Sequence, residues 1–280
     1  MPQAALEQAS ITYRVLGPDD SPHPPVLFVH GILVDHRLWL RVAEPLAASG
    51  FRCILPDLPL GSHTTPVADD VLRTPARVAD LVHEFMVALD LADVTLVGND
   101  TGGGLCQLLI DAHPDRVGRL VLTNCDAFEV FPPFPFNVVF GAMRGPRLIR
   151  ALAGPMRIPA IRHSPLGYGM LCERDDELTA SWIDPAISDP RIARNLATLL
   201  KGVRATDLTD VATRLPRFTE PVTVVWGTAD RAFTPALGRR LAALFSDATF
   251  VEVPGARTFV SLDAPQAVVD AVATIGAARS

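Results

Sequence analysis

The chain has 280 residues, 49% of them hydrophobic and 20% charged, which is enough length and apolar content to bury a large core. Its 25 Lys and Arg against 31 Asp and Glu give a net charge of -6, so we expect no nucleic-acid partner. No run of 18 apolar residues occurs and the N-terminus lacks a secretory signal, so we expect no membrane partner and a cytoplasmic location.

Short apolar runs alternate with stretches of helical periodicity along most of the chain. The runs predict strands at 11–16, 24–30, 51–58, 94–98, 119–123, 221–227 and 248–253. The helical periodicity predicts helices at 38–49, 74–91, 103–113, 235–245 and 265–276. This alternation favours the α/β class, with a mainly parallel sheet flanked by helices.

The interval 127–218 breaks this rhythm. It begins with a stretch rich in Pro and Phe and continues with arginine-bearing pieces of helical character. It carries 12 Arg and Lys against 9 Asp and Glu, whereas the rest of the chain carries 13 against 22. We interpret 127–218 as a mostly helical cap, or lid, inserted into a core domain formed by 1–126 and 219–280.

The residues most typical of a reactive site are Gly98-Asn99-Asp100-Thr101-Gly102, directly after one predicted strand and directly before a helix. This is the context of a nucleophile elbow, in which a strained turn holds the central side chain at the top of the sheet. Small residues on both sides let the strand and the helix approach each other. The helix N-terminus behind the turn favours negative charge there. The central residue here is Asp100.

On these residues the chain resembles the α/β-hydrolase superfamily over nearly its whole length. Further matching motifs are His30-Gly31, Pro56-Asp57-Leu58 and Trp226-Gly227-Thr228-Ala229-Asp230. In having Asp at the elbow, the chain is similar to haloalkane dehalogenases and epoxide hydrolases. In those families the elbow Asp forms an alkyl ester with the substrate. The resemblance implies the nucleophile Asp100, the supporting acid Asp230 or Asp126, and an oxyanion hole from the backbone N–H groups of Thr101 and Ile32.

The chain departs from that superfamily at the triad histidine. Thr258 occupies the position of that histidine, and no histidine follows His163. A threonine hydroxyl cannot take a proton near pH 7 as an imidazole can. The halide-binding Trp and Asn of dehalogenases are also replaced, by Thr101 and Ile32, and the paired cap tyrosines of epoxide hydrolases are reduced to Tyr168.

Two other histidines are candidate bases. His63 lies in a loop after a predicted strand, and His36 follows the oxyanion segment with Asp35 beside it. Each is equally compatible with a solvated loop histidine. We place both among the possible base or pocket residues, together with Thr258 and Tyr168.

Three functions stay open on the sequence. The first is hydrolysis of a small, largely apolar substrate held between sheet and cap, with Asp100 as nucleophile. The second is a non-hydrolytic lyase, isomerase or cyclase in which Asp100 is a general acid or base. The third is a ligand-binding pseudoenzyme. We expect no cofactor and no metal, because the dinucleotide, P-loop and zinc-ligand spacings are absent. The oligomeric state stays open.

Overall fold

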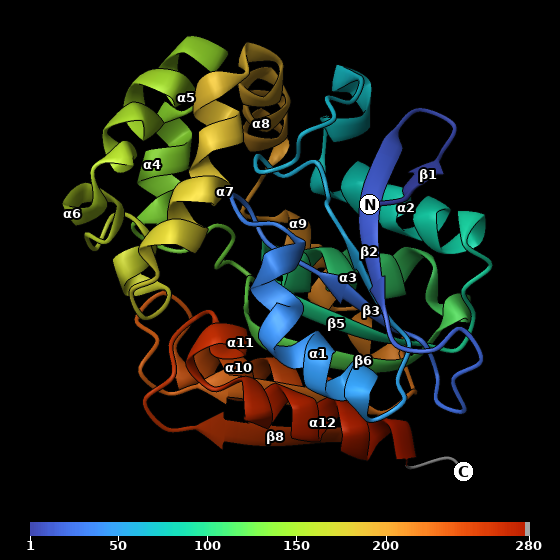
Figure 1. Ribbon diagram of the computed structural model, residues 1–280. Helices are drawn as coiled ribbons and strands as arrows, with labels where there is room; N and C mark the ends of the chain where they lie inside the picture. The colour runs from blue at the N-terminus through green and yellow to red at the C-terminus, as the bar shows by residue number, and fades with distance from the viewer. Residues whose placement is uncertain (278–280) are drawn as a thin grey trace.

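The computed structural model describes residues 1–277, and all eight of their strands form one sheet (Figure 1). The strand order is β1-β2-β4-β3-β5-β6-β7-β8. The pairs β1–β2 and β2–β4 are antiparallel, and every later pair is parallel. The strands are β1 Gln3–Ala5, β2 Ser10–Leu16, β3 Val26–Val29, β4 Cys53–Pro56, β5 Val94–Asp100, β6 Val117–Cys125, β7 Val222–Gly227 and β8 Ala248–Val253.

Helices cover both faces of this sheet. On one face α1 packs against α12, and on the other α2 packs against α3 (Figure 1). The helices are α1 Leu40–Ala48, α2 Pro75–Ala88, α3 Thr101–Ala112, α4 Phe136–Ala142, α5 Pro146–Ala153, α6 Pro159–Arg162, α7 Asp176–Ser188, α8 Pro190–Gly202, α9 Asp207–Ala212, α10 Pro235–Ala242, α11 Val260–Asp263 and α12 Pro265–Ala277. The predicted α/β class with a mainly parallel, helix-flanked sheet is confirmed.

The central strands are apolar along their whole length because both of their faces are covered. Every residue of β3 and β6 is buried, and so is every residue of β5 before Asp100. Such continuous hydrophobic runs are typical of parallel strands between two helical layers. The core therefore lies directly beneath the carboxyl end of β5, where the elbow begins.

The chain between β6 and β7 forms the helices α4 to α9. In Figure 1 the helices α4 to α8 gather on one side of the molecule, away from the edge strand β1. Residues of α4 and α5 line the same cavity as Asp100, so this segment lies over the carboxyl end of β5. The division into a core domain of 1–126 and 219–280 and a cap of 127–218 stays a prediction.

The four cysteines are buried and free. Burial raises the pKa of the Cys53 and Cys172 thiols to about 12, and it also raises those of Cys106 and Cys125. No helix within residues 1–277 is long and apolar enough to cross a membrane.

Candidate active site

Asp100 occupies a strained turn between β5 and α3. Its backbone lies at φ 53° and ψ -132°, a conformation that costs free energy for a residue with a Cβ. Its carbonyl oxygen accepts a hydrogen bond from the Asp126 N–H at 3.3 Å, which fixes the turn to the end of β6. The strain holds the Asp100 side chain clear of the sheet.

Glycines surround this turn because no side chain fits beside it. A Cβ at Gly31 would lie 2.1 Å from Asp100 Oδ2, and one at Gly102 would lie 2.2 Å from the Val29 carbonyl oxygen. A Cβ at Gly98 would lie 2.7 Å from Cys106 Sγ. The spacing that predicts an elbow from the sequence is therefore a steric requirement of the folded chain.

Opposing influences act on the Asp100 carboxyl group. Burial raises its pKa, and the charge of Asp230 raises it further. Hydrogen bonds from the backbone N–H groups of Thr101 and Ile32 favour the carboxylate and lower the pKa. The balance is a pKa raised to about 7, so Asp100 is present both as acid and as carboxylate near neutral pH. The two amides are the pair that the resemblance implies for an oxyanion hole.

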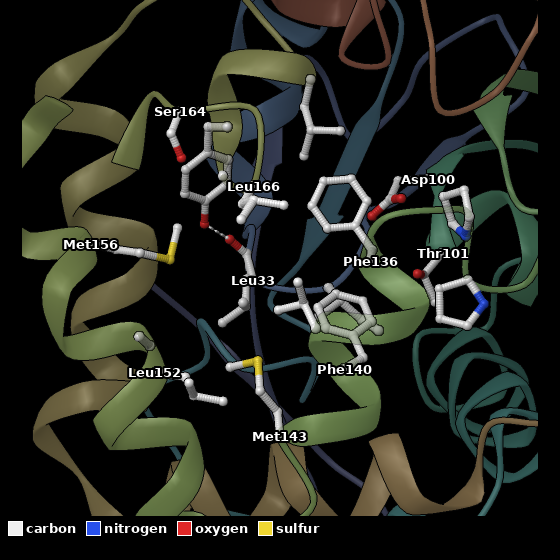
Figure 2. Close-up of a pocket in the computed structure, with 18 of the residues that line it drawn as sticks. Leu33, Asp100, Thr101, Phe136, Phe140, Met143, Leu152, Met156, Ser164 and Leu166 are labelled. Carbon is white, nitrogen blue, oxygen red and sulfur yellow. Dashed lines mark hydrogen bonds between the residues drawn. The ribbon is translucent and has the colours of Figure 1, made fainter. Parts of the chain in front are cut away.

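Asp100 faces an apolar cavity of about 280 Å³ (Figure 2). Figure 2 shows Asp100 and Thr101 at one end, Leu152 and Met156 at the other, and Phe136 between them. The remaining lining is also largely apolar and comprises Ile32, Leu33, Pro132, Pro133, Val139, Phe140, Met143, Ala153, Ile161, Ser164, Leu166, Gly167, Tyr168 and Leu171. The cavity therefore suits a small apolar molecule that lies beside Asp100.

Thr258 is hydrogen-bonded to Asp230. Its Oγ1 donates to Asp230 Oδ2 at 2.8 Å, and Asn124 Nδ2 donates to the same oxygen at 2.9 Å. Burial raises the pKa of Asp230 to about 6, while these and two backbone hydrogen bonds hold it down. Thr258 is fully buried and is absent from the lining of the Asp100 cavity. The structure thus pairs Thr258 with Asp230 as the resemblance pairs a histidine with its acid, but with a hydroxyl in the base position.

Asp126 lies behind the elbow. It is fully buried, and burial and the charge of Asp100 raise its pKa well above the ordinary range, while the Thr101 hydroxyl opposes this with a smaller effect. Burial therefore favours the protonated form of Asp126. It does not line the cavity, whereas Asp100 and Thr101 do.

The histidines His36 and His63 are not brought to Asp100. The Nδ1 atom of His36 lies 2.7 Å from Asp57 Oδ1. His63 Nδ1 accepts from the Gly61 N–H, its Nε2 lies 3.3 Å from an Asn195 oxygen, and burial lowers its pKa to about 4. Neither ring lines the cavity that holds Asp100.

Tyr168 lines the cavity, but its hydroxyl is engaged. It donates a short hydrogen bond to the Leu33 carbonyl oxygen, drawn dashed in Figure 2. Burial raises the pKa of the phenol well above its usual range. This hydrogen bond joins the segment between β6 and β7 to the loop that presents the Ile32 N–H group.

The cluster Asp35, His36 and Asp57 is the one group within residues 1–277 whose ligand atoms lie close enough for a metal ion. Its donor atoms already have partners in the protein. Asp35 accepts from Arg37 and from the Trp182 indole, and His36 is bonded to Asp57. The donor set therefore fits a structural hydrogen-bond network.

The sequence reasoning missed the far wall of the cavity. Leu152 and Met156 lie at the end of the cavity opposite Asp100, and Met143 lies below Phe140, all in and around α5 (Figure 2). No sequence motif marks them, because any apolar side chain of similar size could form this wall of the cavity. The predicted Pro and Phe stretch does supply Pro132, Phe136 and Phe140.

The sheet, the elbow and the cavity define a protein of the α/β-hydrolase class. The family described as alpha/beta hydrolase fold matches residues 24–265, and the chain belongs to it. The resemblance drawn from the sequence is thereby confirmed.

Individual relatives are more distant. The chain is 28% identical over 227 residues to a 2-hydroxy-6-oxononadienedioate/2-hydroxy-6-oxononatrienedioate hydrolase of Cupriavidus pinatubonensis, covering 78% of this chain and 74% of that protein. It is 28% identical over 274 residues to haloalkane dehalogenase 2 of Mycobacterium tuberculosis, covering 91% and 88%. The structure of haloalkane dehalogenase DbeA from Bradyrhizobium elkani superposes with a TM-score of 0.78 at 22% identity, covering 99% of this chain and 98% of that one, which shows a shared fold.

Proposed function

We propose that this protein is an enzyme acting on a small, largely apolar substrate, with Asp100 as the nucleophile. The observation that carries the proposal is the placement of Asp100. A strained turn presents its carboxyl group to an apolar cavity, and two backbone N–H groups donate to that carboxyl group. The similarity to a haloalkane dehalogenase and to a hydrolase of another small molecule supports this reaction class.

The first step uses the ionised form of Asp100. One carboxylate oxygen attacks an electrophilic carbon, a C–O bond forms, and the leaving group departs with the electron pair of the broken bond. The product is an alkyl ester of Asp100. Its carbonyl oxygen accepts hydrogen bonds from the N–H groups of Thr101 and Ile32. The apolar walls keep bulk water from the carboxylate and the carbon.

The second step, hydrolysis of the ester, needs a base to activate water. In the base position the chain holds Thr258, whose hydroxyl donates to Asp230 and has no proton affinity near pH 7. We therefore expect the ester to hydrolyse slowly and to accumulate. An accumulating ester is the signature that separates this proposal from ordinary turnover.

The test is intact-protein mass after incubation with small haloalkanes and epoxides. A haloalkane adds its alkyl group in place of a proton, and an epoxide adds its whole mass. We expect an adduct in the wild type, none in Asp100→Asn, and an adduct in the matched control Asp126→Asn. Asp126 is a good control because it is a buried carboxyl group next to the elbow that does not line the cavity, and an amide has nearly the same shape. If no haloalkane and no epoxide gives either an adduct or a product, the proposal is overturned.

One observation favours a second candidate function. The pKa of Asp100, raised to about 7, is suited to a group that both donates and accepts a proton at neutral pH. In a lyase, isomerase or cyclase Asp100 would move a proton and form no ester, so no base is needed at Thr258. Product formation that requires Asp100 and passes through no adduct would select this candidate. Ligand-induced stabilisation with neither adduct nor product would instead select a binding protein.

A further inference from the structure

The segment 130–172 has an unusual charge distribution. It contains five arginines and no Asp or Glu, while the rest of the chain contains 20 Lys and Arg against 31 Asp and Glu. An otherwise acidic protein therefore carries one purely cationic stretch, in the helices α4 to α6 and their connections.

Exposed apolar side chains concentrate in the same stretch. Seven of the nine large hydrophobic residues exposed within residues 1–277 lie between 134 and 166. We call these seven the apolar rim: Phe134, Val138, Leu148, Leu152, Ile158, Ile161 and Leu166. In Figure 1 the helices α4, α5 and α6 lie on the outer edge of the molecule, on the side away from β1 and β2. A concentration of this kind marks an interaction surface.

The cavity that holds Asp100 opens at this rim. Leu152, Ile161 and Leu166 are exposed to solvent and also line the cavity. An apolar molecule seated on the rim is thus in contact with the residues that lead toward Asp100.

Two arginines in the same segment as the apolar rim are available to bind anions. Arg144 and Arg147 are exposed, and neither side chain makes a hydrogen bond or an ion pair with another residue among 1–277. Arg144 precedes α5 and Arg147 lies in its first turn, and α5 contributes Leu148 and Leu152 to the rim.

A second copy of the chain is a poor occupant of this face. Elsewhere in residues 1–277 the exposed large hydrophobics are only Met1 and Val87, so a partner copy offers no apolar surface to a rim docked head to tail. Arg157 and Arg162 are ion-paired with Asp184 and Asp176 of α7, but two rims facing each other would bring the unpaired Arg144 and Arg147 of one copy toward those of the other. An anionic lipid surface offers both negative headgroups and hydrocarbon.

We propose that the apolar rim docks peripherally on an anionic lipid bilayer, with the mouth of the cavity turned toward the hydrocarbon. An apolar substrate dissolved in the bilayer then enters between Leu152, Ile161 and Leu166. No described helix crosses a membrane, so the contact is with the surface alone. The proposal departs from the expectation of no membrane partner, which rested on the lack of a long apolar run. It does not depend on the chemistry of Asp100.

The test is flotation of the protein with vesicles of phosphatidylcholine, with and without about one third phosphatidylglycerol. We expect flotation with the anionic vesicles and little with the neutral ones. The double variant Val138→Asp/Ile158→Asp, at exposed residues outside the cavity lining, is expected to lose flotation. The matched control is Val87→Asp, an exposed apolar residue on α2, which is expected to float as the wild type does.

The charge contribution is tested separately. Arg144→Glu/Arg147→Glu is expected to weaken binding to anionic vesicles about tenfold or more, and Arg73→Glu, an exposed arginine outside the segment, is expected to have little effect. Thermal melting of each variant checks that it is folded. Asp100→Asn is expected to float normally, which separates this proposal from the proposed reaction.

Two results would overturn the proposal. One is a wild-type protein that does not float with anionic vesicles. The other is a dimer in solution, seen by light scattering, that the Val138→Asp/Ile158→Asp variant converts to monomer, because a second copy would then occupy the rim.

Discussion

The two reactions proposed for Asp100 need different ionisation states of its carboxyl group. Burial raises its pKa to about 7, so the carboxylate becomes the main form only above neutral pH. If Asp100 is a nucleophile, the rate of adduct formation should rise with pH through about 7 and then level off. If it is a general acid, the rate of product formation should fall over the same range. The two roles are distinguished by mass measurements on reactions quenched at timed intervals, between pH 5 and pH 9, about two pH units on each side of that pKa.

The same raised pKa has a consequence for stability. The folded protein holds the Asp100 proton up to about pH 7, whereas the unfolded chain releases it near 3.8. Stability is thus lost as pH rises through that window. Asp100→Asn removes the titration, so the variant should be more stable than the wild type at pH 8, by about 4 kcal/mol at most.

The measurement is urea unfolding of both proteins at pH 5 and at pH 8. The advantage of Asp100→Asn should be larger at pH 8. A variant that is less stable than the wild type at pH 8 would show that the carboxylate is better solvated than its burial implies.

Thr258 provides a test of the missing base. Its hydroxyl already donates to Asp230, so a histidine at this position has an acceptor for one of its ring N–H groups. We expect Thr258→His to hydrolyse a preformed Asp100 ester faster than the wild type does, seen as loss of the mass adduct with time. Thr258→Ser, which keeps the hydroxyl, is the matched control. A folded Thr258→His variant with an unchanged ester lifetime would contradict the idea that only a base is missing from a site otherwise able to hydrolyse the ester.

At the scale of elements, one hydrogen bond joins the helical segment to the oxyanion loop. The hydroxyl of Tyr168, which follows α6 along the chain, donates to the carbonyl oxygen of Leu33, next to Ile32. Tyr168→Phe leaves that buried oxygen without its donor, which should cost about 1–3 kcal/mol. We also expect slower adduct formation, because the Ile32 N–H group is held less firmly.

The matched control is Tyr13→Phe, since Tyr13 is the other tyrosine and packs edge-on against Phe85 far from the cavity. Urea unfolding and adduct rates of both variants check the prediction. Equal effects of the two substitutions would show that the Tyr168 hydroxyl has no special role.

The elements that the sequence predicts well are those whose burial is uniform. The strands β3, β5 and β6 are apolar throughout because two helical layers cover them, and that pattern is visible in the sequence. The short β1 was missed, because its three residues, only one of them buried, carry no periodicity. The individual helices between β6 and β7 were not predicted one by one either; α4, for example, buries no residue completely, and its apolar side chains Phe136, Val139 and Phe140 line the cavity instead.

The same distinction applies to the candidate site. The elbow and its glycines could be predicted because their steric requirements are local in sequence. The partners of His36 and His63 could not, because Asp57 and Asn195 reach them from distant parts of the chain. No periodicity encodes such contacts.

At the scale of the whole molecule, burial is unevenly distributed. The central strands β5 and β6 are almost completely buried, while α4 has no fully buried residue and α6 has only Arg162. We therefore expect amide hydrogens of α4 to α6 to exchange with deuterium before those of β5 and β6. Hydrogen exchange followed by mass spectrometry measures this. Equal protection of both regions would show that they open together as one cooperative unit.

The burial of all four cysteines makes their thiols unreactive toward electrophiles. Their thiols stay protonated at neutral pH, since burial raises every one of their pKa values, and a protonated thiol is a poor nucleophile. A haloalkane bearing a dye would then meet no competing cysteine thiolate on the folded chain. Labelling would be confined to one carboxylate in one cavity, so fluorescence in a gel band would count occupied sites directly.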